Sequence, residues 1–228
     1  MQQTDKNTVN AKNQLETSQY VSFWGEANAK VKVLFVGNSI TRHGVAAEIG
    51  WNNDFGMAAS KMENDYVHIL AEQILDIVPA SFCICQVSVW EQDYKNGTDY
   101  FHLFQDAREF KADVIIMRTI ENSSKEGFDG KAFSEQYKAL LDFLNKQSSS
   151  NIILTSSFWR HVGDPEVEKL SQERKLPYVQ INDLGEKDEM KAIGKYEHSG
   201  IANHPGDEGM RLIAERIWNV LKEMIETY

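Results

Sequence analysis

Cysteine, proline and positive charge are all scarce in this sequence of 228 residues. Its only two cysteines, Cys83 and Cys85, exclude a framework of several disulfides. They lie two positions apart in an apolar run, and we interpret them as buried thiols on one face of a strand rather than a metal-binding or redox pair. The 34 Asp and Glu residues outnumber 24 Lys and Arg, which leaves a formal charge of −10. Because nucleic acid and anionic membranes repel such a protein, we expect neither as a partner.

Long apolar runs are also missing. No run approaches the roughly 18 residues that a membrane span needs, and residues 1–28 lack the basic and apolar regions of a signal peptide. The chain as given therefore predicts a soluble cytoplasmic protein, although a leader removed earlier would leave no trace in it. Because neither a repeat nor a linker-like tract divides the sequence, we expect a single domain over residues 19–228, preceded by a loosely ordered polar segment over residues 1–18.

Short apolar segments rich in β-branched residues alternate with segments of helical periodicity. The apolar segments predict five buried parallel strands, at residues 31–36, 81–89, 114–118, 151–156 and 178–181. The amphipathic segments predict helices at residues 63–77, 100–110, 131–146, 165–175 and 207–227. Strict alternation of strand and helix implies right-handed crossovers, so the expected fold is α/β, a three-layer α/β/α sandwich. In such folds the ligand site lies beyond the carboxyl ends of the strands.

A serine follows the first predicted strand, within the sequence Gly37-Asn38-Ser39-Ile40-Thr41. Glycine allows a sharp turn at the tip of the strand, and the hydroxyl of Ser39 can then project from the edge of the sheet as a nucleophile. Two alternatives remain open at this point, a helix cap formed by Ser39 or Thr41 and a small anion cradle. The glycine patterns of phosphate loops and the GxSxG elbow of the α/β-hydrolases are absent.

An asparagine and a histidine follow other predicted elements. Asn122 comes after the third strand and can donate a side-chain N–H to an oxyanion, although asparagine is also an ordinary turn residue. His204 precedes the last helix in a loop constrained by Pro205, and an imidazole of ordinary pKa near 6.5 is a natural base for a serine hydroxyl. His198 and His204 lack the spacing of a metal-binding helix motif, so we predict no metal and no cofactor.

Aromatic residues occur in the same predicted loops. Trp51 and Phe55 follow Ser39, Trp90 follows the second strand and Trp159 follows the fourth. Each could belong to the core or to the wall of a pocket, and their location at one edge favours a substrate pocket.

Together, GNSIT at 37–41, Asn122 and NHPGDEGM at 203–210 resemble the sequence blocks of the SGNH superfamily, also called GDSL-type esterases and lipases. The resemblance extends from about residue 31 to the C-terminus. It implies a flavodoxin-like α/β/α sandwich and a carboxylic ester hydrolase. It also implies that Ser39 is the nucleophile and donates to the oxyanion hole through its amide, that Asn122 is an oxyanion-hole donor, and that His204 is the base.

Two departures from that pattern concern the first and second blocks. Asn38 stands where the best-known version of the first block has Asp, which leaves the nucleophile unchanged. The second block normally supplies a glycine amide to the oxyanion hole. No glycine lies beside Trp90, and Gly97 comes too late, so Glu91 is the nearest candidate for this donor.

The third departure concerns the acid of the triad. The family usually has Asp three residues before the histidine, and Ile201 occupies that position here. Because the acid serves to fix the imidazole tautomer, another acceptor could replace it. We expect a dyad of Ser39 and His204 steered by a backbone carbonyl, with Glu197 and then Asp207 as the alternative acceptors.

These residues predict a serine esterase that hydrolyses a small acyl ester through an acyl-enzyme on Ser39, with an O-acetylated carbohydrate as the favoured substrate. The alternative is a weak or silent carbohydrate-binding domain of the same fold, because the usual Asp and glycine are missing. The sequence leaves the oligomeric state open.

Overall fold

The computed structural model of the chain describes residue 7, residues 14–15 and residues 19–228. Most of the predicted N-terminal segment, residues 1–18, lies outside these residues, and the single domain over residues 19–228 stays a prediction. Six strands form one sheet in the order β1-β3-β2-β4-β5-β6. They are β1 (Val21–Gly25), β2 (Val31–Gly37), β3 (Ala80–Gln86), β4 (Val114–Arg118), β5 (Asn151–Thr155) and β6 (Tyr178–Val179).

The five strands from β2 to β6 are parallel, and their spatial order is that of a doubly wound, flavodoxin-like sheet. The predicted α/β/α fold is therefore confirmed. After β2 the chain adds β3 on one side of that strand, and then adds β4, β5 and β6 on the other side. The strand order therefore reverses between β2 and β4, which are neighbours in the sheet. At such a switch point the crossovers on the two sides diverge, and a cleft opens at the carboxyl ends of the two strands.

The strand β1 is absent from the sequence prediction. It pairs antiparallel with β3 at the edge of the sheet, where Phe23 lies opposite Cys83 and is 52% exposed. An edge strand of this kind lacks the continuous buried run by which parallel strands are recognised. The prediction was also wrong beyond Gln86, because the chain leaves β3 there and turns into the short helix α2 (Ser88–Gln92). The Gln86 side chain stabilises this turn by accepting hydrogen bonds from the amide and hydroxyl of Ser88, at 3.0 and 2.8 Å.

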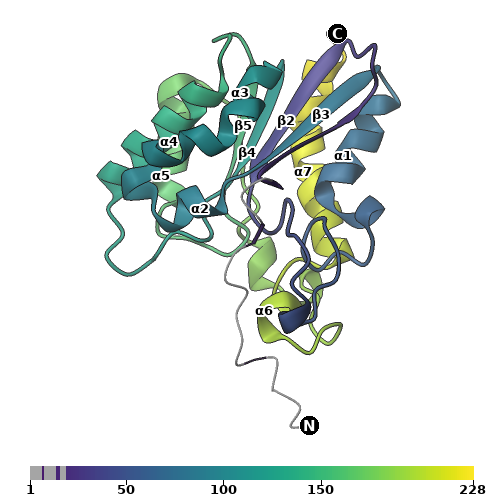
Figure 1. Ribbon diagram of the computed structural model, residues 1–228, viewed down its shortest axis with the longest axis vertical. Coiled ribbons are helices and arrows are strands. Elements are labelled where there is room, and N and C mark those ends of the chain that lie inside the picture. The colour runs from purple at the N-terminus through teal and green to yellow at the C-terminus, as the bar shows by residue number, and fades with distance from the viewer. Residues whose placement is uncertain (1–6, 8–13, 16–18) are drawn as a thin grey trace.

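Helices cover both faces of the sheet (Figure 1). On one face α1 (Tyr66–Leu75) and α7 (Asp207–Ile225) pack on the side of β2 that carries Val33 and Phe35. On the other face Leu34 and Val36 meet the helices α3 (Gln105–Phe110), α4 (Gly130–Leu144) and α5 (Asp164–Arg174). This alternation along β2 buries both faces of the strand.

Short helical turns make up much of the remaining chain. The predicted helix at residues 100–110 is a 3-10 segment, η5 (Tyr94–Phe104), that continues into α3. The connections also contain η3 (Ala47–Ile49), η4 (Met62–Asn64), η6 (Leu184–Glu186), η7 (Asp188–Met190) and α6 (Ser199–Ala202). No helix in the described part of the chain has the length and apolar character that crossing a membrane requires.

Cys83 and Cys85 are free, fully buried thiols on the same side of β3, as predicted. Burial raises the pKa of both thiols well above the ordinary value. Both side chains therefore act as small apolar core residues.

Candidate active site

The turn after β2 holds the Ser39 side chain at the switch point of the sheet. A Cβ added to Gly37 would lie 1.9 Å from the Thr41 hydroxyl oxygen and 2.8 Å from the Arg118 carbonyl oxygen, so only glycine fits there. The amides of Thr41 and Arg42 donate to the Asn38 carbonyl at 2.8 and 2.9 Å and close the turn. These constraints leave Ser39 6% exposed at the edge of the sheet.

The structure brings Ser39 and His204 together although 165 positions separate them. The Ser39 Oγ lies 2.9 Å from the His204 Nε2. On the other side of the ring, Nδ1 lies 2.7 Å from the Gly200 carbonyl oxygen in α6. A carbonyl can only accept, so Nδ1 carries the hydrogen and Nε2 is free to accept the serine proton.

Neither of the two alternative carboxylates occupies the position beside Nδ1. Asp207 instead accepts hydrogen bonds from the amide and hydroxyl of Ser60, at 2.8 and 2.7 Å, and from the Asn64 side chain at 2.9 Å. Glu197 is exposed, and its carbonyl accepts from the Asn7 side chain at 3.2 Å. The position three residues before His204 belongs to Ile201, which is 1% exposed and packs in the core. The acceptor beside Nδ1 is thus a backbone carbonyl, and neither of the alternative acceptors, Glu197 and Asp207, occupies that position.

Burial lowers the pKa of His204 to about 4. The neighbouring His43 and Arg118 also disfavour protonation, while the Gly200 carbonyl and Glu121 favour it. The Trp159 ring contributes to this burial, because it packs edge-on against the imidazole with 5.1 Å between the ring centroids. The imidazole is consequently neutral near pH 7, which is the state required of a general base.

Ser39 and His204 line a cleft of about 250 Å³. Asn122 and Trp159 line it too, together with His43, His198, Gln14 and Gln92 among others. The other three predicted pocket aromatics lie in the core. Trp51 and Trp90 are fully buried, and Phe55 packs edge-on against Trp51.

Tertiary packing explains why the aromatic prediction was wrong at three positions. The Trp51 indole donates to the His43 carbonyl at 3.0 Å and stabilises the loop beneath the cleft. Trp90 faces α4, where it packs against Phe133 and Tyr137. Only Trp159 extends from its strand end into the cleft, so position at one edge of the sheet does not decide which way a ring points.

No protein-family model and no curated protein matches this sequence. Solved structures match most of the chain. A member of the lipolytic protein G-D-S-L family from Veillonella parvula has a TM-score of 0.54 at 12% identity, over 84% of this chain and 98% of the other. A psychrotrophic esterase from Pseudoalteromonas sp. has a TM-score of 0.57 at 12% identity, over 86% of this chain and 99% of the other. A two-domain esterase active on acetylated mannans has a TM-score of 0.56 at 16% identity, over 86% of this chain and 50% of the esterase chain. The chain has the fold of the GDSL-type esterases.

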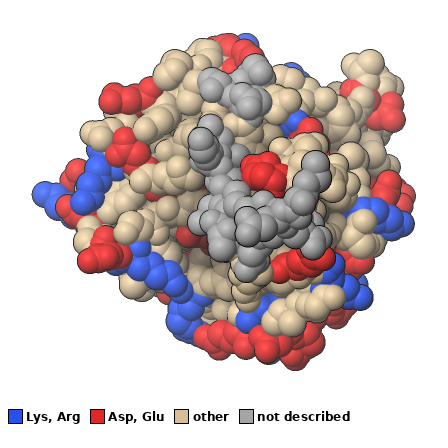
Figure 2. All heavy atoms as spheres, turned by 60° about the horizontal axis from the view of Figure 1, so that its bottom comes forward, with Lys and Arg blue, Asp and Glu red and all other residues tan. Residues whose placement is uncertain are grey.

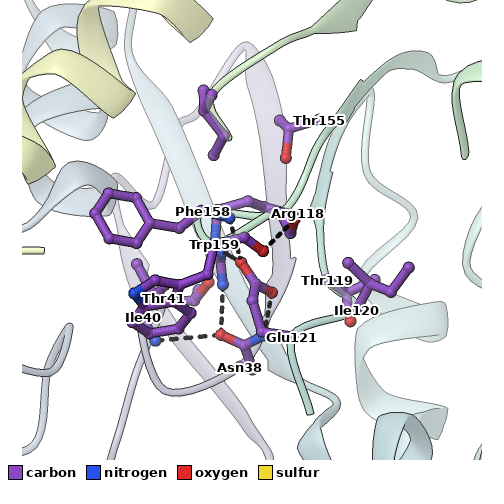
Figure 3. Close-up of polar contacts among 12 residues, drawn as sticks. Asn38, Ile40, Thr41, Arg118, Thr119, Ile120, Glu121, Thr155, Phe158 and Trp159 are labelled. Atoms are coloured by element: carbon purple, nitrogen blue, oxygen red, sulfur yellow. Dashed lines mark hydrogen bonds and ion pairs between the residues drawn. The ribbon is translucent and has the colours of Figure 1, made fainter. Parts of the chain in front are cut away.

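Within this GDSL fold, a buried polar network surrounds Asn38, the residue before Ser39 (Figure 3). The Asn38 Nδ2 donates to Glu91 Oε1 at 2.9 Å and to Glu121 Oε2 at 2.6 Å, and its Oδ1 accepts from the Arg118 guanidinium. Arg118 also pairs with Glu121 and is fully buried. Asn38 therefore connects the turn after β2 to α2 and to the end of β4.

The network contains two carboxylates and one guanidinium. Burial, together with the charge of Glu121, raises the pKa of Glu91. Burial opposes ionisation of Arg118, but the two carboxylates raise its pKa above the ordinary value. An Asp at position 38 would add a third carboxylate against both Glu91 and Glu121, whereas the Asn38 amide donates to both. The presence of Asn rather than Asp at position 38 is thus explained by the two carboxylates beside it.

Glu91 does not fit the predicted role of oxyanion donor. Its amide donates to the Val87 carbonyl at 3.0 Å within α2, and its side chain is fully buried. The carboxylate instead accepts from the Ile120 amide at 2.5 Å, the Asn122 amide at 3.1 Å and the Asn122 side chain. Ile120 has a φ of 133°, a strained conformation for a β-branched residue, and these bonds stabilise it. Glu91 therefore shapes the loop after β4.

The Asn122 side chain reaches the cleft from this loop. Its Nδ2 has two hydrogens, of which the bond to Glu91 uses one. Its Oδ1 accepts from Gln14 at 3.0 Å.

The sequence prediction lacks several residues that line the cleft, among them His43, His198, Gln14 and Gln92. His43 is four positions after Ser39, and its polarity within the same loop is a signal that could have indicated it. Its Nδ1 donates to the Gly44 carbonyl at 2.7 Å, and burial lowers its pKa. His198 caps α6 by accepting from the Ile201 amide at 3.3 Å. No motif indicates Gln14 or Gln92. Among the described residues, no three His, Cys, Asp or Glu side chains are arranged to hold a metal ion.

Proposed function

We propose that this chain is a serine esterase that hydrolyses a small acyl ester, and that its substrates are O-acetylated carbohydrates. The observation that carries the proposal is the 2.9 Å separation of Ser39 Oγ and His204 Nε2, with Nδ1 held at 2.7 Å by the Gly200 carbonyl. A hydroxyl, a neutral imidazole and a fixed tautomer are the parts that nucleophilic acyl transfer needs.

In the proposed reaction, His204 Nε2 takes the Ser39 proton while Oγ attacks the ester carbonyl carbon. The Ser39 amide and the free N–H of Asn122 donate to the resulting oxyanion. The imidazolium then gives its proton to the departing alcohol oxygen, which leaves an acyl-enzyme. Water, deprotonated by His204, attacks the acyl carbon, and Ser39 leaves with the proton.

A carbonyl in place of a carboxylate has a definite chemical consequence. The Gly200 oxygen fixes the imidazole tautomer as well as an acid would, but it has no full negative charge with which to stabilise the imidazolium. We therefore expect turnover below that of an enzyme with the complete triad, and well above that of one whose imidazole has the wrong tautomer.

The size and lining of the cleft support a small acyl group on a polyhydroxylated alcohol. Its volume of about 250 Å³ is small for a ligand pocket. Its imidazole and amide groups can exchange hydrogen bonds with hydroxyls, and the Trp159 ring offers an apolar surface. Acidic and basic side chains are interspersed around the rim of the face that Figure 2 brings forward. Among the structures with this fold are the esterase active on acetylated mannans and a Clostridium thermocellum carbohydrate esterase in complex with cellohexaose.

The test is to label the protein with a fluorophosphonate and to map the modified peptide by mass spectrometry. We expect a single adduct on Ser39, which Ser39→Ala abolishes and His204→Ala strongly slows, while Ser134→Ala on α4 serves as the matched control. Hydrolysis of p-nitrophenyl esters of increasing chain length and of acetylated sugars then defines the substrate, with acetyl esters expected to be fastest.

A silent carbohydrate-binding domain is the second candidate, favoured by the buried Ile201 in place of the acid and by the engaged Glu91 amide. It predicts no adduct on Ser39 and no hydrolysis, together with measurable binding of oligosaccharides by calorimetry.

A further inference from the structure

Gln14 lies in the cleft beside the proposed oxyanion donor. It lines the same cavity as Ser39, Asn122 and His204. Its Nε2 donates to Asn122 Oδ1 at 3.0 Å, and its Oε1 accepts from Gln86 Nε2 at 2.6 Å. Gln14 thus bridges a side chain at the end of β3 and a side chain that follows β4, although it lies far from both in the sequence.

Residues 14 and 15 are attached to the loop that follows the nucleophile. The Gly44 amide donates to the Gln14 carbonyl at 2.9 Å, and Leu15 is 4% exposed in the core. A Cβ on Gly44 would lie 2.9 Å from a Leu15 methyl carbon, so the two segments meet closely. The Gln14 backbone therefore has a fixed place from which its side chain reaches Asn122.

The orientation of the Gln14 amide is determined by Gln86. Gln86 is fully buried, and its Oε1 accepts from both the amide and the hydroxyl of Ser88. Its Nε2 must then face Gln14, where only the oxygen of the Gln14 amide can accept. The nitrogen of Gln14 is thereby directed to the Asn122 oxygen.

Asn122 consequently has an anchor on each end of its side-chain amide. Glu91 accepts from Nδ2, and Gln14 donates to Oδ1. The hydrogen bond to Glu91 alone leaves the planar amide some freedom to turn about its Cβ–Cγ bond, whereas anchors on both its nitrogen and its oxygen fix its plane and so direct the remaining N–H. Such preorganisation is what an oxyanion hole requires.

We propose that Gln14 is a positioning residue that orients the Asn122 amide toward the oxyanion, an inference that rests on the proposed esterase function. Gln14 touches no reacting atom in this scheme and acts through Asn122.

The kinetic test compares Gln14→Ala with Gln19→Ala, an exposed glutamine of the same segment that does not line the cleft. Losing one hydrogen bond should lower kcat for p-nitrophenyl acetate roughly 2- to 12-fold with KM nearly unchanged, and Gln19→Ala should leave both constants unchanged. Gln14→Glu should lower kcat at least as much, because a carboxylate cannot donate to Oδ1. In an Asn122→Ala background, Gln14→Ala should have no further effect. An unchanged or increased kcat in Gln14→Ala, or an equal loss in the Asn122→Ala background, would overturn the proposal.

A second measurement does not depend on activity. In protein labelled with 15N-asparagine, the Asn122 side-chain signals are those missing from Asn122→Asp. Gln14→Ala should shift and broaden these signals, and Gln19→Ala should not. If the signals stay unchanged in Gln14→Ala, the positioning role is wrong. If they change but the wild-type protein neither hydrolyses esters nor reacts with the fluorophosphonate, the contact holds while the esterase function and the positioning role that depends on it fail.

Discussion

The pH dependence of activity offers the sharpest test of the site, because burial of His204 moves its pKa from 6.5 to about 4. The neutral imidazole is the active form, so kcat/KM should fall as pH decreases through the pKa of the free protein. At about pH 5, a base with a pKa of about 4 is about 90% neutral, whereas one at 6.5 is about 3% neutral. The two cases differ about 30-fold in activity at that pH.

The assay is kcat/KM for p-nitrophenyl acetate between about pH 3.5 and about pH 8, with Ser39→Ala as the blank and circular dichroism to confirm that the protein remains folded. We expect a flat profile above about pH 5 and a single acid limb with its midpoint near pH 4. The ordinary imidazole pKa would instead place the decline near pH 6.5. A midpoint there would refute the argument that burial keeps His204 neutral.

The Trp159→Ala variant tests the cause of the shift. The ring packs edge-on against the imidazole, and its removal would admit water and reduce the desolvation that lowers the pKa. The kinetic midpoint should therefore move upward toward 6.5. A midpoint that does not move would show that Trp159 contributes nothing to the desolvation of His204.

Three further predictions concern the oxyanion loop, the nucleophile turn and acid stability. Asn122→Ala should cost about 2.7 to 4 kcal/mol of transition-state stabilisation, a decrease of roughly a hundredfold or more in kcat; full activity in steady-state assays would mean that Asn122 is not an oxyanion donor. Gly37→Ala should lower the melting temperature in calorimetry, because its Cβ would lie 1.9 Å from the Thr41 hydroxyl oxygen; an unchanged transition would contradict the close contact. The unfolding free energy in urea should decrease as pH falls from about 6.5 to about 4, because unfolded His204 binds a proton that the folded state excludes; His204→Gln should weaken this dependence, and an identical slope in the variant would assign it to other groups.

The polar network around Asn38 shows how a departure from a sequence pattern can be balanced elsewhere. The presence of Asn at position 38 is explained by its contacts with Glu91 and Glu121. These residues are 53 and 83 positions away and approach Asn38 from α2 and from the end of β4. Arg118 pairs with Glu121 in this network, and the raised pKa of Glu91 and the neutral Asn38 both limit the buried negative charge.

Local patterns in the chain were enough to predict the layers of the fold and to single out the serine, the asparagine and the histidine. Strand and helix periodicities are local properties, and a turn residue such as Gly37 constrains only its own neighbourhood. The five parallel strands were therefore predicted, whereas the half-exposed edge strand β1 was not.

Which side chains face the cleft depends on contacts between segments that are distant in the sequence. The sequence analysis expected a backbone carbonyl to orient His204, but every residue has a carbonyl and no sequence pattern indicates that the one beside Nδ1 belongs to Gly200. Trp51 and Trp90 point into the core while Trp159 points into the cleft, because packing partners from distant segments set the direction of each ring. Gln14 reaches Asn122 across 108 positions, and a contact over that separation exists only when the chain is folded.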